Sequence, residues 1–190
     1  MKEYSTKNSK AGKQMRTDAS ENRLTIINTA RALFVERGPE LSMSEIAKVA
    51  NVSRATLYRN FEDKSDLVLS LMVYNLEQLE IFAQKLERDE NEFFVLIKKT
   101  AELQFLYQGL IPFLPESVDA INNRIISLME GPVNRAKSRG ILVEDFDVLK
   151  DTSLIVTMLG SATLRALDMN LKGSMDRAIK IVFKGISPEK

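Results

Sequence analysis

Apolar residues in this chain recur every three or four positions, in stretches separated by short breaks rich in Gly, Pro, Asn and Asp. This spacing places the apolar side chains on one face of an α-helix. It predicts two short helices between residues 42 and 64, and longer ones over about 20–37, 64–86, 91–110, 117–130, 133–139, 148–169 and 175–185. Strand-like alternation of apolar and polar residues is absent from the sequence, as are internal repeats. The expected fold class is therefore all-α, with about nine helices.

Two Gly-Pro pairs stand where helices are expected to end. Gly38-Pro39 follows the first long helix, and Gly131-Pro132 separates the helices expected over 117–130 and 133–139. Proline has no backbone N–H, and inside a helix its ring collides with the carbonyl one turn earlier. We therefore interpret both pairs as helix stops.

The stretch from Ser42 to Lys64 has the pattern of two short helices joined by a tight turn. Ser42 and Glu45 match a capping box at the first helix, and Ser53 can cap the second by accepting from its first free N–H groups. Asn51 stands at the turn, where a residue that tolerates positive φ is needed. The inner face carries Ile46, Ala47, Ala50, Val52 and Leu57, and the outer face of the second helix carries Arg54, Thr56, Tyr58, Arg59 and Asn60. A helix-turn-helix presents such a polar face to the major groove of DNA. The alternative interpretation is a pair of packing helices in an ordinary bundle.

The run V-S-R-A-T-L-Y-R-N-F is preceded by E-I-A-K-V-A and followed by D-K-S-D-L. This run resembles the TetR family of bacterial transcriptional regulators, over a match that extends from about Arg23 to Leu67. Upstream, Ile26-Ile27, Ala30, Leu33-Phe34 and Gly38 are similar to the family's first helix. Three residues depart from the family pattern: Asn51 and Ala55 stand where Gly is common, and Asn60 stands where His is common.

The resemblance implies that both short helices contact double-stranded DNA. The residues at the family's usual contact positions are Ser42, Ser44, Arg54, Ala55, Thr56, Tyr58, Asn60 and Lys64. Arg54 can donate two parallel hydrogen bonds to O6 and N7 of a guanine. The contacts better suited to phosphates, which fix register without reading sequence, are those of Ser42, Ser44, Thr56, Tyr58 and Lys64.

Charge is unevenly distributed along the chain. Residues 1–64 carry 12 Lys and Arg against 8 Asp and Glu, whereas residues 65–190 carry 15 against 18. A basic first part beside a mildly acidic remainder fits an anionic polymer as the partner of the first part only. This distribution agrees with a flexible basic arm over 1–18 and a helix-turn-helix DNA-binding domain over 19–64. The family resemblance implies that residues 65–190 form an effector-binding and dimerisation domain.

The helix expected over 91–110 is apolar nearly all round, since Glu102 is the only charged residue from Thr100 to Ile111. Such a helix is usually buried, and plain core packing is its more common role. The family resemblance instead implies a pocket for a small-molecule effector among the middle helices. The candidate ligand-binding residues are Phe93, Ile97, Ala101, Gln104, Phe105, Tyr107, Gln108, Phe113 and Met129. Pockets of this kind are mostly apolar with a few polar anchors, for which Glu102, Gln104, Tyr107 and Gln108 are available.

The last two expected helices carry apolar stripes and the small-residue patch Gly160-Ser161-Ala162. Packing within one molecule is one interpretation of these stripes. The family resemblance implies a four-helix interface between two copies, and a palindromic operator requires such two-fold symmetry. The candidate dimer-interface residues are Ile155, Met158, Leu159, Ala162, Ile179, Val182 and Phe183.

The chain has no Cys and no His, which excludes disulfides and removes the commonest general base and metal ligand. No nucleophile–base pair, phosphate loop or metal-ligand cluster is recognisable. No apolar run is long enough to span a bilayer, and the N-terminus lacks a signal-peptide core. We expect a cytoplasmic, sequence-specific DNA-binding regulator without a cofactor, not an enzyme: a repressor released from a palindromic operator by a small, largely apolar effector. The alternative is a helical DNA-binding protein without an effector pocket.

Overall fold

The computed structural model describes residues 5–86, 89–114, 119–168 and 174–188. These residues form eight α-helices and one short 3₁₀ helix, with no strand among them, so the expected all-α fold class is confirmed. None of the helices in this part of the chain is long and apolar enough to cross a membrane. The chain divides into two compact units, residues 1–71 with 112–115 and residues 72–111 with 116–190.

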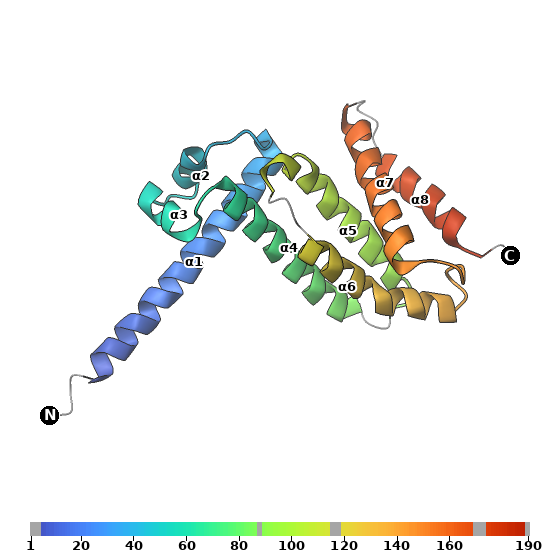
Figure 1. Ribbon diagram of the computed structural model, residues 1–190, viewed down its shortest axis with the longest axis horizontal. Helices are drawn as coiled ribbons and strands as arrows, with labels where there is room; N and C mark the ends of the chain where they lie inside the picture. Colours follow the sequence, from blue (N-terminus) through green and yellow to red (C-terminus); the bar gives the residue numbers. More distant parts are fainter. Residues whose placement is uncertain (1–4, 87–88, 115–118, 169–173, 189–190) are drawn as a thin grey trace. The chain divides into compact units, whose positions relative to one another are not determined.

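The first unit is built from α1 (Ser5–Arg37), α2 (Met43–Val49) and α3 (Arg54–Asn60), which pack around one another and are blue to cyan in Figure 1. The first turns of α4 (Lys64–Leu86) complete it. Apolar residues at helical spacing meet in one core, whose most deeply buried members are Ile26, Ala30, Ile46, Leu57, Phe61, Leu67 and Val68. Each large apolar side chain buried there contributes about 1.5–3 kcal/mol, which holds α2 and α3 although helices so short are unstable alone.

α1 begins much earlier than the sequence pattern predicted. We expected a flexible arm over 1–18 and a helix from about Ser20, whereas α1 starts at Ser5. About half of the added residues are good helix formers such as Lys, Ala, Gln, Met and Arg, and Gly12 is the least favourable of the others. Extending an existing helix adds one hydrogen bond per residue and avoids the cost of a new nucleus. Apolar periodicity therefore marks the packed part of α1, not its beginning.

The second unit contains the rest of α4, α5 (Glu92–Gln108), α6 (Asp119–Ser138), α7 (Val148–Asp168) and α8 (Ser174–Ile186). A 3₁₀ turn, η1 (Ile111–Phe113), follows α5, and its last two residues belong to the first unit. α7 packs against α5, α6 and α8, and Figure 1 shows α5 and α7 side by side. The core includes Phe93, Leu96, Ile97, Ala101, Met129, Val133, Leu142, Phe146 and Leu159. The rings of Phe93 and Phe146 meet edge to face with their centroids 5.5 Å apart. α5 is thus a buried helix, as its composition predicted.

α6 runs through the Gly131-Pro132 pair, so the prediction of separate helices over 117–130 and 133–139 was wrong. Met129, Pro132 and Val133 are all buried, so the helix packs apolar surface on both sides of the pair. Gly131 in turn makes room for a charged neighbour, because a Cβ added there would lie 3.2 Å from both Nη atoms of Arg135. Tertiary packing here offsets the roughly 3 kcal/mol that proline costs inside a helix.

Candidate functional site

α2 begins with the predicted capping box. The backbone N–H of Glu45 donates to Oγ of Ser42 at 3.2 Å, and the N and Oγ of Ser42 lie 2.8 and 2.7 Å from Oε2 of Glu45. Hydrogen bonds from the Ser42 hydroxyl, and next from its backbone N–H, lower the pKa of the Glu45 carboxyl. The Ser42 hydroxyl must leave Glu45 before it can donate to a phosphate. Ser44, another predicted phosphate contact, is half-buried on the first turn of α2.

The turn into α3 also has the predicted geometry. Asn51 has a φ of 54°, and Ser53 caps α3 by accepting from the backbone N–H of Thr56 at 3.0 Å. α3 is seven residues long, about two turns. Its inner side is anchored by Leu57, which is 0% exposed. The direction of α3 is therefore set by contacts at its ends and by one buried leucine.

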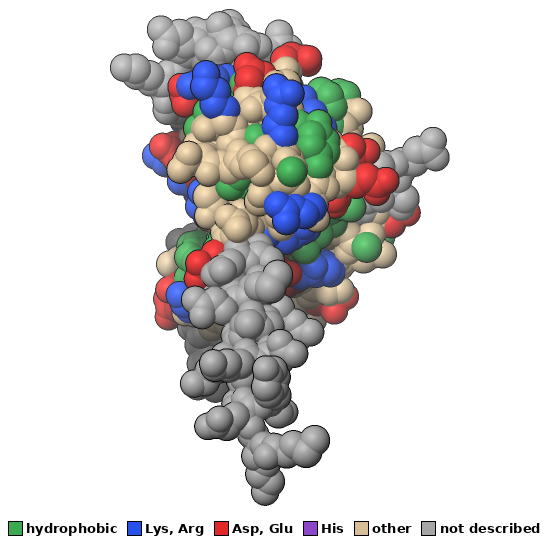
Figure 2. All heavy atoms as spheres, turned by 90° about the vertical axis from the view of Figure 1, so that its left-hand side faces the viewer, with side chains coloured by type: hydrophobic (Ala, Val, Ile, Leu, Met, Phe, Trp, Pro, Cys, Tyr) green, Lys and Arg blue, Asp and Glu red, His purple; other side chains and the backbone are tan. Residues whose placement is uncertain are grey.

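The outer face of α3 carries Arg54, Ala55, Tyr58 and Arg59, all of which are exposed. Arg59 folds back along the helix, where its Nε donates to the carbonyl of Ala55 and its Nη2 to Oγ1 of Thr56, both at 3.1 Å. Figure 2 looks onto the side on which α2 and α3 lie and shows several Lys and Arg side chains spread over this face. Arg54 is the first residue of α3, the end at which a recognition helix meets base edges.

Like Ser42, two more of the predicted DNA contacts, Asn60 and Lys64, are occupied by bonds within the first unit. The side-chain nitrogen of Asn60 donates to the carbonyl of Thr56 at 2.8 Å. Nζ of Lys64 lies 3.8 Å from the ring centroid of Phe113 and donates to the carbonyl of Pro39. Partial burial lowers the pKa of the Lys64 ammonium. Phe113, one of the predicted ligand-binding residues, belongs to the first unit.

The sequence interpretation did not single out Arg23. This half-buried residue of α1 lies on the ring of Phe61 and donates to the last residue of α3. One signal in the sequence pointed to it: Arg23 precedes Ile26 and Ile27 by three and four positions, so helical geometry puts it on the packed face of α1.

Most of the predicted ligand-binding residues whose side chains are described pack as core. Phe93 is 2% exposed, and Ile97, Ala101 and Met129 are 0% exposed. A side chain without accessible surface borders no void large enough for a water molecule. A ligand would reach these residues only if their neighbours moved. Gln104 is half-buried, and the remaining side chains, those of Phe105, Tyr107 and Gln108, lie outside the described residues.

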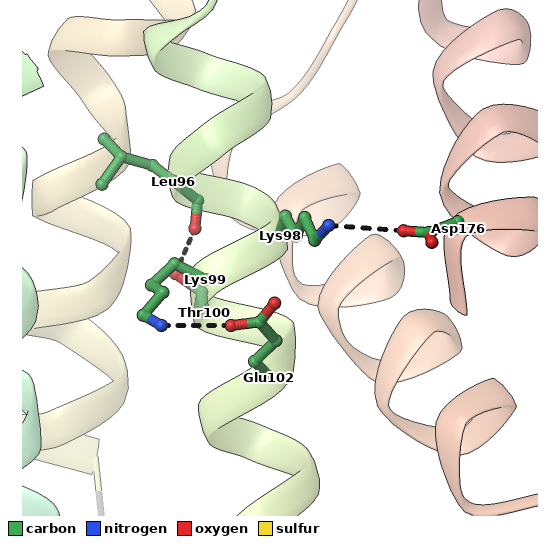
Figure 3. Close-up of polar contacts among 6 residues, drawn as sticks. All are labelled: Leu96, Lys98, Lys99, Thr100, Glu102 and Asp176. Carbon is green, nitrogen blue, oxygen red and sulfur yellow. Dashed lines mark hydrogen bonds and ion pairs between the residues drawn. The ribbon is translucent and has the colours of Figure 1, made fainter. Parts of the chain in front are cut away.

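Several polar groups along α5 already have partners, as Figure 3 shows, and one of them, Lys98, pairs with Asp176 of α8 at 3.3 Å. Oγ1 of Thr100 donates to the carbonyl of Leu96 at 2.9 Å, and Nζ of Lys99 lies 3.2 Å from Oε2 of Glu102. Glu102, a candidate polar anchor for a ligand, thus already has a partner on its own helix.

An open cleft of about 600 Å³ lies along α6 in the second unit, and no predicted ligand-binding residue lines it. Its lining includes two bidentate ion pairs. Arg124 holds Glu80 at 3.0 and 2.8 Å, and Arg135 holds Glu92 at 2.9 and 2.7 Å. Hydrogen bonds to Glu80 raise the pKa of Arg124. These pairs join α6 to α4 and to α5.

The structure divides the predicted dimer residues between core and surface. Ile155, Leu159 and Ile179 are 4%, 0% and 8% exposed, so they pack inside the second unit. Met158 is 51% exposed, which leaves it available to another molecule. Val182 and Phe183 are half-buried, and the side chain of Ala162 lies outside the described residues.

Other exposed apolar residues lie on the same two helices. Leu154, one turn before Met158 on α7, is 57% exposed, and Ile181 on α8 is 61% exposed. The sequence pattern did not separate these residues from their buried neighbours, because Leu154 and Ile155 are equally apolar. The exposed stripe of α7 therefore runs through Leu154 and Met158, and the stripe through Ile155 and Leu159 faces the core.

Residues 26–71 match the family model for bacterial regulatory proteins of the tetR family. An HTH-type transcriptional regulator of Staphylococcus aureus (strain MRSA252) is 34% identical over 114 residues, which span 58% of this chain and 60% of that relative. The crystal structure of E. coli NemR in its reduced form has a TM-score of 0.70 at 16% identity, over 87% of this chain and 97% of that one. A TetR regulatory protein from Mycobacterium vanbaalenii has a TM-score of 0.67 at 21% identity, over 92% and 99%. At these identities the structural likeness is one of fold, and the similarity to the tetR family of bacterial regulatory proteins rests on residues 26–71, the segment that contains the helix-turn-helix.

Proposed function

We propose that this chain is a transcriptional regulator that binds operator DNA through α2 and α3, and that it acts in the cytoplasm by binding and not by catalysis. The observation that carries the proposal is the short, capped α3, which buries Leu57 on one side and exposes Arg54 and Tyr58 on the other. A helix-turn-helix uses this arrangement to enter a major groove. The Staphylococcus aureus relative is named a transcriptional regulator, which supports the same role here.

Binding to a selected operator tests this proposal. The unaltered protein is used to enrich an operator from random DNA, and fluorescence anisotropy then gives Kd. Arg54→Ala should weaken operator binding by about 1–3 kcal/mol and relax the preference at one base pair. Arg139→Ala removes an exposed arginine of the second unit and controls for the change in charge. Failure to enrich any sequence, or equal operator affinity for Arg54→Ala, would refute the assignment.

We further propose that two copies associate through the exposed apolar residues of α7 and α8, so that two recognition helices meet a palindromic operator. Leu154→Glu should then yield monomers in sedimentation. Leu149 is 58% exposed, close to the 57% of Leu154, and helical geometry places it on the other side of α7. Leu149→Glu should therefore remain dimeric. An unaltered protein that is monomeric at micromolar concentration would contradict this proposal.

A small, largely apolar effector in the second unit is the proposed signal for release from the operator. α4 begins shortly after α3 and supplies residues to both units. Its 23 residues correspond to roughly 35 Å of helix. A ligand that tilts α4 would move the start of this helix, next to the recognition helix, with a coupling of about 1–3 kcal/mol.

The second candidate is a DNA-binding protein without an effector pocket. The complete burial of Ile97, Ala101 and Met129 favours it, because a pocket at these residues would have to open. Operator titrations with and without a bound apolar molecule distinguish the two. Equal operator affinity in both titrations, with the molecule shown to be bound, would contradict the effector mechanism for that molecule.

A further inference from the structure

Arg23 ties three helices of the first unit together. Its Nη1 donates to the backbone carbonyl of Asn60, the last residue of α3, at 2.5 Å. Its Nη2 donates to Oγ of Ser70 on α4 at 2.7 Å, and its Cζ lies 4.4 Å from the ring centroid of Phe61. One side chain of α1 therefore holds the end of α3, the residue that follows it, and α4.

The carbonyl that Arg23 reaches belongs to the C-terminal end of α3. The last four carbonyls of a helix have no partner within the helix, and this end carries partial negative charge. A guanidinium there supplies both a donor and a favourable charge. The side-chain amide of Asn60 closes the same turn by donating to the carbonyl of Thr56 at 2.8 Å.

A chain of hydrogen bonds extends this contact to the connection between α3 and α4. Oγ of Ser70 lies 3.4 Å from Oδ1 of Asp66, and Oδ2 of Asp66 accepts from the backbone N–H of Glu62 at 3.0 Å. The backbone N–H of Asp66 donates to Oδ1 of Asp63 at 2.9 Å. The connection is therefore linked to Arg23 through Asp66 and Ser70.

We propose that Arg23 is a positioning residue for DNA recognition: it sets the direction in which α3 presents its outer face, and it makes no contact with DNA itself. This inference rests on the proposed function and adds the residue that orients its reading surface. At its first end α3 is held by the Ser53 cap, and in its middle by Leu57. At its far end α3 is followed by the buried Phe61, and Arg23 contacts both this ring and the carbonyl of Asn60, so the last turn of α3 should shift when Arg23 is lost.

The test compares Arg23→Gln, Arg23→Lys and the charge-matched control Arg139→Gln. Arg23→Gln should weaken operator binding about tenfold. Arg23→Lys should weaken it less, because lysine keeps the positive charge, but it should not restore full affinity, because one ammonium cannot reproduce the two donated bonds. The dependence of log K on log salt should keep its slope, since a lost phosphate contact would change the slope by about 0.9. Arg139→Gln should bind the operator as the unaltered protein does.

Hydrogen exchange without DNA supplies an independent readout. The backbone N–H of Phe61 donates to the carbonyl of Leu57, and that of Ala50 in the turn after α2 donates to the carbonyl of Ile46. Arg23→Gln should speed exchange about tenfold at Phe61 and leave Ala50 unchanged.

Three results would overturn the inference: unchanged operator affinity, a shallower salt slope, or exchange that rises equally at Phe61 and Ala50. If the unaltered protein binds no operator, the proposed function fails, while faster exchange at Phe61 alone still supports the role of Arg23 in holding α3. Arg23→Lys keeps the charge and the folded core, so the test remains decisive where Arg23→Gln does not fold.

Discussion

Removing the ring beneath Lys64 should increase affinity for DNA. Lys64 is a predicted phosphate contact, yet its ammonium lies 3.8 Å from the ring centroid of Phe113 and donates to the carbonyl of Pro39. To reach a phosphate, the ammonium must leave both partners. Phe113→Leu weakens the first of these contacts while keeping an apolar side chain, so the folded protein resists release of Lys64 less.

The size of the effect follows from the geometry. A cation above an aromatic ring contributes about 0.5–1 kcal/mol at exposed sites and about 2 when desolvated. Lys64 is half-buried, and a value of about 1 kcal/mol corresponds to about a fivefold change in affinity for each half-site. With two copies on a palindromic operator the two contributions add, giving a change of about 25-fold.

A double-mutant cycle isolates this contribution. Operator Kd is measured for the unaltered protein, Phe113→Leu, Lys64→Met and the double variant at one salt concentration. Phe113→Leu should tighten binding only when Lys64 is present. Thermal unfolding of each variant shows whether the loss of the half-buried ring has disturbed the fold.

Two results would refute this reasoning. Operator affinity that stays the same or falls in Phe113→Leu would mean that Lys64 does not leave the ring on binding DNA. An equal gain in the Lys64→Met background would mean that the ring acts through another group.

Three further predictions concern stability. Hydrogen bonds from Ser42 lower the pKa of the Glu45 carboxyl. The stability that these bonds contribute is therefore present above the ordinary pKa of a glutamate, about 4.3, and is lost as the pH falls through the lower pKa of the folded state. Urea unfolding of the unaltered protein and Glu45→Gln should therefore differ most near neutral pH and converge in acid, and a constant difference would contradict this. Glu92→Gln removes the carboxylate, 5% exposed, that holds Arg135 in a bidentate pair. Because Arg135 is partly solvated, the free energy of unfolding should fall by about 1–3 kcal/mol in the same assay, and a change near zero would contradict this. Asn51 has a φ of 54°. Asn51→Gly should change the free energy of unfolding by no more than about 0.5 kcal/mol, whereas Asn51→Ala should lower it by about 1 kcal/mol because alanine is strained at positive φ. Equal stability of the two variants would contradict this explanation.

The features predicted correctly depend on residues close together in the chain. The capping box joins Ser42 to Glu45, and the cap of α3 joins Ser53 to Thr56, each at a separation of three residues. The partners of Arg23, in contrast, are 37 and 47 residues away. Local pattern specifies a cap or a turn because the participating atoms meet whenever the segment folds. A contact over such separations exists only after the helices have packed, so helical spacing could place Arg23 on the packed face of α1 but could not indicate its partners.

The exposed face of α7 was missed for a different reason. Ile155 and Leu154 are neighbours of similar hydrophobicity, but one residue along a helix turns the side chain by about 100°. Periodicity shows that an apolar stripe exists on α7, and it cannot tell a stripe that packs inside one molecule from one that is left exposed. Only the packing of α7 against α5, α6 and α8 makes the distinction, leaving Ile155 at 4% and Leu154 at 57% exposure.

The predicted DNA contacts fall into two classes once their present partners are known. Ser42, Asn60 and Lys64 each donate to an acceptor within the first unit, so any bond to DNA must replace an existing one and yields only the difference between the two. Arg54 and Tyr58 are exposed on α3, and a bond from either to DNA replaces water alone. The larger share of the affinity should therefore come from Arg54 and Tyr58. A DNA contact by Ser42, Asn60 or Lys64 requires a hydrogen bond within the first unit to break. These three residues should therefore make DNA binding depend on the strength of those internal bonds.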